Sequence, residues 1–167
     1  MNGSLLYLDF DGVLHHHNVM FHPLIGPYLS AAPEGAVLFQ HMNVLQDLLK
    51  PYPAVQIVLS TSWVARLGLA MAKKQLHPDL RQRVIGATCR SSKDRARMSN
   101  LSRGQQVLAD VHQRQPTAWL AVDDDASDWP MAYRARLVHT DKYLGLGDMQ
   151  AVAALQSALM ATFGAQR

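Results

Sequence analysis

The sequence contains one cysteine and one glutamate in 167 residues, and its apolar runs are all short. The lone cysteine, Cys89, excludes an internal disulfide and fits a reducing compartment, which predicts a cytoplasmic protein. A bilayer span needs about 20 apolar residues, and the longest candidate, 149–163, is interrupted by Gln150 and Gln156. The N-terminus lacks the basic region that begins a signal peptide. We therefore expect no membrane partner.

The scarcity of glutamate means that aspartate carries almost all of the negative charge. Of the 13 acidic residues, Glu34 is the single glutamate, although glutamate is the better helix former of the two acids. Six aspartates fall into two clusters, at 9–11 and 123–128, which is typical of a site rather than of a solvated surface. The rest of the chain then has seven acids against 16 basic residues, a net charge of about +9. A basic body of this kind would attract a polyanion such as a nucleic acid.

The pattern of apolar residues predicts an α/β fold, and the length predicts a single domain over 1–167. Short apolar runs predict five strands, at 5–8, 55–59, 83–87, 118–122 and 136–139. Helical patterns lie between or after them, at 36–49, 63–76, 104–113 and 149–163. Such alternation favours a doubly wound, Rossmann-like parallel sheet with helices on both faces.

Polar side chains stand where three of these strands end. Asp9 follows the first strand, Ser60 the second and Asp123 the fourth. In doubly wound sheets the ligand site lies beyond the carboxyl ends of the strands. Asp11 and Asp124 add further carboxylates, and hard oxygen ligands of this kind suit Mg²⁺. The sequence therefore predicts a magnesium site that draws on two strands.

Other residues near these strand ends could bind an anion. Ser60 and Thr61 offer hydroxyl and main-chain N–H donors near the start of a helix. Arg103 opens the helix before the fourth strand and could bring a positive charge to a phosphate. A carboxylate nucleophile, a metal, a hydroxyl donor and a cation are the parts that phosphoryl transfer needs.

At these positions the sequence resembles a known superfamily. Three segments, in order, resemble motifs I, II and IV of the haloacid dehalogenase (HAD) superfamily: Leu8–Leu14, Ile57–Thr61 and Ala121–Asp124. The chain is also similar to the small bacterial HAD domains of Swiss Army knife RNA-repair proteins, through Leu59–Trp63, Arg83–Gly86 and Val122–Asp125. The resemblance spans nearly the whole chain.

The resemblance implies a Mg²⁺-dependent phosphomonoester hydrolase, that is, a HAD-type phosphatase. Asp9 would attack phosphorus and form an aspartyl-phosphate, and Asp11 would protonate the leaving oxygen and then activate water. Asp9, the main-chain carbonyl of Asp11 and the acids of motif IV would hold the metal. Motif IV fits either the pair Asp123 and Asp124 or the more widely spaced pair Asp124 and Asp128.

The phosphate-binding groups implied by the resemblance also have alternatives. Ser60 would bind the phosphoryl group, or Thr61 would do so if the strand ended one residue later. The superfamily usually places a lysine in motif III. This chain offers Arg103, with Lys93 as the alternative cation.

The HAD core usually carries a cap domain over its site, but the two insertion points here are short. The segments 14–55 and 88–103 cannot form a separate cap domain. The expected open site favours a macromolecular or nucleic-acid-end substrate by family analogy. The alternative is a non-catalytic nucleic-acid or partner-binding module on a HAD fold. The clustered acids argue against it, because they destabilise a fold that holds no cation.

Three further features have plainer interpretations. The run His15–His17 predicts a loop near the site entrance, because adjacent residues cannot all face one metal ion. The three tryptophans, Trp63, Trp119 and Trp129, are expected in the core or at its rim. If one of them contacts the substrate, we expect it to be Trp129, which follows the acidic cluster. The basic run 90–97 is interpreted as a solvated loop, with a nucleic-acid contact as the alternative.

Overall fold

A five-stranded parallel sheet forms the centre of the computed structural model, which describes residues 3–89, 94, 96 and 100–164. The strands lie side by side in the order β5-β4-β1-β6-β7. This arrangement confirms the predicted α/β, Rossmann-like fold, and each predicted strand boundary is correct to within one residue. The strands are β1 (Ser4–Leu8), β4 (Gln56–Leu59), β5 (Val84–Ala87), β6 (Ala118–Asp123) and β7 (Leu137–His139).

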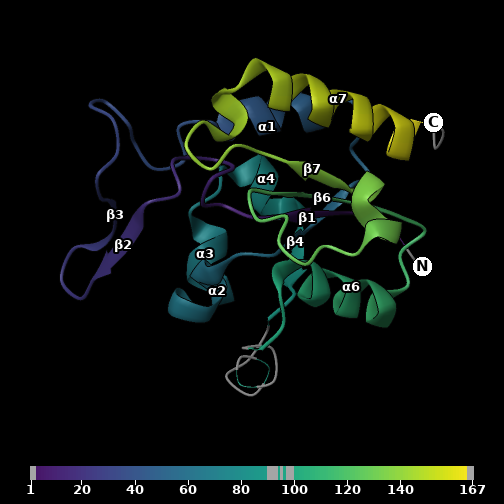
Figure 1. Cartoon of the computed structure of the whole chain (residues 1–167), viewed down its shortest axis with the longest axis horizontal. Helices are drawn as coiled ribbons and strands as arrows, with labels where there is room; N and C mark the ends of the chain where they lie inside the picture. Colours follow the sequence, from purple (N-terminus) through teal and green to yellow (C-terminus); the bar gives the residue numbers. More distant parts are fainter. Residues whose placement is uncertain (1–2, 90–93, 95, 97–99, 165–167) are drawn as a thin grey trace.

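Helices cover both faces of the sheet, with α1 and α7 on one side and α6 on the other (Figure 1). No helix in the described part of the chain is both long and apolar enough to cross a membrane. Two short 3-10 helices, η1 (Met131–Arg136) and η2 (Gly145–Gly147), flank β7. The α-helices are α1 (Met42–Leu49), α2 (Ser62–Leu67), α3 (Leu69–Lys74), α4 (Pro78–Arg83), α6 (Arg103–Arg114) and α7 (Met149–Phe163).

The alternation of side chains along β1 divides the core into two layers. Leu6 and Leu8 pack into the larger layer, which α1 and α7 cover. Leu5 and Tyr7 point to the opposite face and pack against Val107 of α6. Because β1 is buried on both faces, its sequence is a continuous apolar run rather than an alternating one.

The helix predicted over 36–49 begins only at Met42, so the prediction is wrong for 36–41. In a longer helix, the N–H groups of residues 39 and 41 would donate to carbonyls of the same helix. Here both donate to the loop after β1. The Phe39 N–H donates to His15 Nδ1 at 3.2 Å, and the His41 N–H donates to Leu14 O at 2.9 Å. Phe39 also adopts a left-handed conformation, with a φ of 60°. Contacts with the loop after β1 therefore replace the first turns of the helix.

The helix predicted over 63–76 is also wrong in part, because it is two helices. Gly68, with a φ of 81°, separates α2 from α3. A residue with a side chain adopts this conformation only at a cost, so the glycine makes the break possible. The short helix α4 after it was not predicted.

A two-stranded antiparallel hairpin, which the apolar pattern does not predict, lies between β1 and α1. It consists of β2 (Val19–His22) and β3 (Gly26–Leu29), and it projects from one side of the sheet (Figure 1). Phe21 of β2 fixes it to the body of the protein. The Phe21 ring packs edge-to-face on Trp63 with a centroid separation of 5.3 Å, and the Arg66 guanidinium lies 4.8 Å from its centre.

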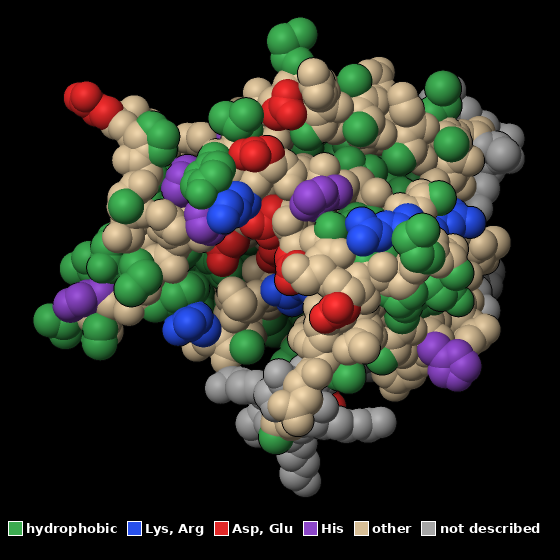
Figure 2. Space-filling view, viewed as in Figure 1, with side chains coloured by type: hydrophobic (Ala, Val, Ile, Leu, Met, Phe, Trp, Pro, Cys, Tyr) green, Lys and Arg blue, Asp and Glu red, His purple; other side chains and the backbone are tan. Residues whose placement is uncertain are grey.

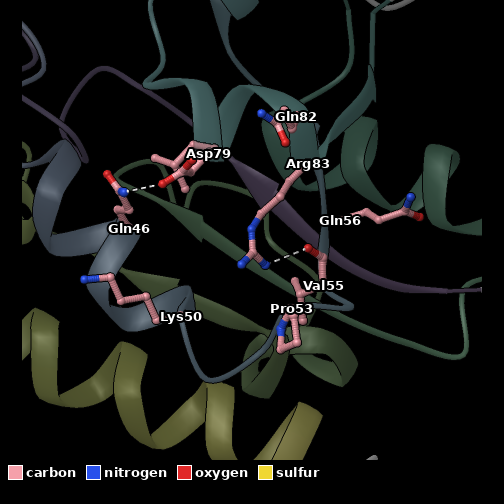
Figure 3. Close-up of a pocket in the computed structure, with 9 residues that line it drawn as sticks. Gln46, Lys50, Pro53, Val55, Gln56, Asp79, Gln82 and Arg83 are labelled. Atoms are coloured by element: carbon pink, nitrogen blue, oxygen red, sulfur yellow. Dashed lines mark hydrogen bonds between the residues drawn. The ribbon is translucent and has the colours of Figure 1, made fainter.

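A cavity of about 460 Å³ lies at the amino ends of β4 and β5, opposite the edge where a ligand is expected (Figure 3). Arg83 crosses it and is committed to the fold. Its guanidinium donates to Tyr52 O at 2.6 Å, to Val55 O at 3.2 Å and to Leu49 O at 3.3 Å. Burial lowers the pKa of Arg83, while Asp79 partly offsets this effect.

We expect Arg83→Met to destabilise the protein by about 1–3 kcal/mol, because three carbonyls lose a charged donor. Chemical denaturation measures this change. Lys50→Met removes an exposed charge from the same cavity and should change stability by less than about 0.5 kcal/mol. Equal effects of the two substitutions would contradict the role given to Arg83.

Candidate active site

Three polar residues lie next to one another at the carboxyl edge of the sheet. The last residue of β1 pairs with the last residue of β4 and with the penultimate residue of β6. The ladder continues past these positions, since Asp9 N–H donates to Val122 O at 3.2 Å and Ser60 N–H donates to Leu8 O at 2.8 Å. Asp9 therefore lies between Ser60 and Asp123, on the face that α6 covers.

Three carboxylates converge at this edge. Asp9, Asp123 and Asp124 each offer an oxygen, and these oxygens all lie within 4.8 Å of one another. Asp9 and Asp123 are 4% and 1% exposed, whereas Asp124 is half-buried. Acidic side chains gather in a hollow near the middle of this surface, with Lys, Arg and His side chains around it (Figure 2). Of the predicted metal-binding residues, the structure therefore brings together the carboxylates of Asp9, Asp123 and Asp124.

The crowding of these acids makes each of them harder to ionise. Burial, followed by the charge of Asp11, raises the pKa of Asp9 to about 6, although Arg103 opposes the shift. Burial and the charges of Asp9 and Asp11 raise the pKa of Asp124 to about 7. Burial and Asp9 also raise the pKa of Asp123 well above its usual range. A bound cation would relieve all three effects at once.

Arg103 is the cation that the structure places beside these acids. It is the first residue of α6, and its Nε lies 3.4 Å from Asp123 Oδ2. Burial opposes its charge, but the attraction of Asp9 and Asp123 outweighs burial and raises its pKa. Ser102 caps the helix and accepts a hydrogen bond from Gln105 N–H, which fixes where Arg103 begins the helix. Lys93, the alternative cation, lies outside the described residues.

Ser60 and Thr61 differ in what their hydroxyls already do. The Thr61 side chain lowers the pKa of Asp9 and caps α2 by accepting from Trp63 N–H at 3.4 Å. Ser60 Oγ is buried and has no hydrogen-bond partner among the described residues. A buried unpartnered hydroxyl is unfavourable, and one beside a nucleophile is available to a ligand. This favours Ser60 over Thr61 as the phosphate-binding residue.

The loop after β1 is held tightly against the acids. Gly12 has a φ of 70°, and a Cβ at this position would collide with the Asp124 carboxylate. Thr140, which follows β7, donates from Oγ1 to Gly12 O at 2.7 Å. The loop therefore needs glycine for its conformation and for its close approach to Asp124.

Other residues of the acidic run have structural rather than ligand positions. Asp125 N–H donates to Asp123 Oδ1 at 3.0 Å and helps to orient that carboxylate. Asp128 is exposed and does not belong to the convergent group, which favours the paired form of motif IV. Trp129 takes the core position that is expected for the tryptophans, and not a position at the surface of the site. It is 3% exposed, packs in the α6 layer of the core and donates from Nε1 to Tyr133 O at 3.0 Å.

Two residues at the site were not identified from the sequence. His15 was interpreted as part of a loop near the entrance, yet it is fully buried and its Nε2 lies 3.0 Å from Asp11 Oδ1. Trp63 Nε1 donates to the same oxygen at 2.7 Å. The Asp11 carboxylate is therefore turned toward these two rings and is separate from the group formed by Asp9, Asp123 and Asp124. For the contact between Asp11 and His15, the one signal in the sequence is that the two residues are four positions apart.

Comparison with protein families matches residues 5–151 to the family described as HAD domain in Swiss Army Knife RNA repair proteins. The chain belongs to this family. No curated protein and no solved structure matches the sequence at a significant level. Membership in the HAD family makes phosphoester hydrolysis the general class of activity, and it agrees with the order of the strand-end acids along the chain.

The carboxylates of this HAD domain fit a divalent cation. Three oxygens from two strands approach one another, and their pKa values are raised in the absence of a cation, mainly by burial and mutual repulsion. Hard oxygen donors of this type bind Mg²⁺, which usually keeps several waters as well. Asp9, Asp123 and Asp124 are therefore the residues that could hold the metal.

We expect the metal-free protein to lose stability as the pH rises from about 5 to 8, and Mg²⁺ to reduce this loss. A carboxyl whose pKa is higher in the folded state binds more protons when folded, so deprotonation between the two pKa values favours unfolding. At ten times its Kd, Mg²⁺ should raise the melting temperature by about 4 °C. Thermal melts across pH, with and without Mg²⁺, measure both effects.

Asp124→Asn should weaken both the pH dependence and the response to Mg²⁺, because it removes one of the crowded charges. Asp79→Asn makes the same chemical change at the opposite edge of the sheet and should leave the response to Mg²⁺ intact. A melting temperature that does not respond to Mg²⁺ in the wild-type protein would contradict the metal site.

Proposed function

We propose that this HAD domain is a Mg²⁺-dependent phosphomonoesterase that acts, as one domain, through an aspartyl-phosphate on Asp9. The observation that carries the proposal is the register of β1 with β4 and β6, which sets Asp9 between Ser60 and Asp123. A nucleophile, a hydroxyl donor and a metal ligand are thereby adjacent. Arg103 adds a fixed positive charge beside them.

In the first step, an Asp9 oxygen attacks phosphorus as the bond to the leaving oxygen breaks. Phe10 N–H donates to Asp9 Oδ1 at 2.8 Å and so fixes the orientation of the nucleophile. Asp11, initially protonated, gives its proton to the leaving oxygen. Ser60 and Arg103 bind the phosphoryl oxygens. Mg²⁺ on Asp9, Asp123, Asp124 and the Asp11 carbonyl would offset the repulsion between Asp9 and the phosphate.

In the second step, water attacks the phosphorus of the aspartyl-phosphate and the bond to Asp9 breaks. Asp11, now a carboxylate, accepts a proton from that water, which restores its protonated form. Inorganic phosphate leaves and Asp9 is again ionised. The same side chain thus serves as acid and then as base, which requires it to lie outside the group of metal-binding carboxylates, as it does here.

The surroundings of the site support a nucleic-acid end as the substrate. In the described residues, the segment between β1 and β4 adds a hairpin and one helix rather than a cap domain. An aromatic rim is formed by His17 and Tyr143, whose ring centroids are 5.1 Å apart, with the buried His16 packed against both. The Lys142 ammonium lies 5.0 Å from the centre of the Tyr143 ring. Aromatic and cationic side chains of this kind bind bases and phosphates of single strands. The family description names RNA repair proteins, which agrees with this choice.

We expect Mg²⁺-dependent release of phosphate from a generic aryl phosphate and from an end-phosphorylated oligonucleotide. Asp9→Asn should lower kcat/KM by about a thousandfold or more, because it removes the nucleophile. A panel of nucleotides, 5′- and 3′-phosphorylated oligonucleotides, phosphopeptides and sugar phosphates tests the substrate class. Asp79→Asn serves as the matched control and should retain activity.

Salt should reduce kcat/KM for the oligonucleotides more than for the aryl phosphate, because the basic body attracts a polyanion. No hydrolysis of any phosphoester with Mg²⁺ present would overturn the proposed function. Salt-sensitive nucleic-acid binding that survives Asp9→Asn, without hydrolysis, would instead identify a non-catalytic binding module.

We expect Ser60→Ala to make the protein less active and more stable at the same time. It removes a buried hydroxyl that has no partner among the described residues, which should stabilise the fold by about 1 kcal/mol. It also removes a phosphate donor, which should lower kcat/KM by about 10- to 100-fold. Thr61→Val should instead lower stability, because the Thr61 hydroxyl caps α2 by accepting from Trp63 N–H. Unchanged activity in Ser60→Ala would exclude Ser60 as a phosphate donor.

A further inference from the structure

The two oxygens of the Asp11 carboxylate have different surroundings. Trp63 Nε1 lies 2.7 Å from Oδ1 and His15 Nε2 lies 3.0 Å from the same atom. Both rings are fully buried, whereas the Asp11 side chain is 22% exposed. Two interior rings therefore meet one oxygen of a side chain that reaches the surface.

The backbone determines how His15 takes part in this contact. Phe39 N–H points at His15 Nδ1 from 3.2 Å, and a backbone N–H can only donate. Nδ1 is therefore the acceptor nitrogen of a neutral imidazole, and the ring proton lies on Nε2. Nε2–H faces Asp11 Oδ1, so both the histidine and the tryptophan donate to this oxygen.

Packing holds the Trp63 indole in place. Three aromatic rings meet it edge-to-face, with centroid separations of 5.8 Å for Phe10, 5.3 Å for Phe21 and 5.1 Å for Phe39. Phe10 lies one residue before Asp11, Phe21 belongs to the hairpin and Phe39 precedes α1. Because three rings hold the indole, Trp63 cannot turn to follow a moving acceptor. Its N–H therefore determines where the Asp11 carboxylate lies.

From this geometry we infer that Trp63 and His15 are positioning residues that make Oδ2 the proton-carrying oxygen of Asp11. The lone pairs of Oδ1 are occupied by two donors, so a proton on the carboxyl group must lie on Oδ2. Oδ2 then gives that proton to the leaving oxygen in the first step and takes one from water in the second. This inference rests on the proposed function. It gives a buried tryptophan the role of orienting Asp11, the general acid.

Leaving groups of different basicity test the inference. Trp63→Phe keeps an aromatic ring at this position but removes the N–H, so Asp11 should lose the shorter of its two donors and with it part of its fixed orientation. For an alkyl phosphate, whose alkoxide needs a proton, kcat/KM should fall by about 30- to 100-fold. For p-nitrophenyl phosphate, whose leaving group departs without a proton, kcat/KM should fall by less than about threefold. The readout is the ratio of kcat/KM for the two substrates. We use kcat/KM because it reports only the first step, in which the leaving group departs.

Trp119→Phe is the matched control, because it makes the same change near the amino end of β6 and should leave the ratio unchanged. The double variant Asp11→Asn/Trp63→Phe should have the same ratio as Asp11→Asn, since Trp63 acts through Asp11. Equal losses for the two substrates in Trp63→Phe, or a further change of the ratio in the double variant, would overturn the inference and leave the proposed function in place. No hydrolysis by the wild-type protein would overturn the proposed function and the inference with it.

A second measurement does not depend on a tryptophan variant that folds. In ¹H–¹⁵N spectra of the ¹⁵N-labelled protein, Asp11→Asn should shift the Trp63 indole resonance, because the acceptor of its N–H changes from a carboxylate to an amide. The indole resonance of Trp119 should stay in place. An unmoved Trp63 resonance would show that the indole does not bond Asp11 and would overturn the inference.

Discussion

Strand β1 is hydrogen-bonded to β4 on one side and to β6 on the other, and the arrangement of the active site depends on this double pairing. Because apolar side chains cover both faces of β1, a shift by one residue would exchange the two layers of the core. The same shift would move Asp9 to the face that α1 and α7 cover, away from Asp123. Burial of the core therefore sets the register, and the register sets the distance between the nucleophile and its metal-binding neighbours.

The edge assembled in this way is locally unfavourable. Asp9, Asp123 and Asp124 repel one another, and the Ser60 hydroxyl is buried without a partner among the described residues. Arg103 offsets part of this repulsion but is itself desolvated. Proteins concentrate such unsatisfied interactions where a ligand is to satisfy them, while the rest of the structure supplies the stability. Here an incoming cation and phosphate would complete interactions that the protein leaves open.

The sequence predicts the sheet well because buried parallel strands have short, continuous apolar runs, and the polar residue after each run marks the edge of the site. It predicts poorly whatever depends on contacts between distant residues. The turn that shortens α1 exists because Phe39 N–H bonds His15, and the hairpin is held through Phe21. Trp63 lies 52 residues from Asp11, and neither residue type nor spacing indicates that they meet. Trp129 packs in the core although it follows the acidic run, so its place in the sequence does not indicate a role at the site.

The hairpin formed by β2 and β3 resembles a surface decoration, since Leu24 and Ile25 at its tip are 89% and 70% exposed. Phe21, one pair before the turn of the hairpin, has a different status, because its ring packs edge-to-face against Trp63. A relative that shortened or replaced this hairpin would have to supply another contact in order to keep the indole fixed. The hairpin is thus not an interchangeable insertion, because the exposed residues of its turn are free to vary during evolution whereas Phe21 is constrained by its contact with Trp63.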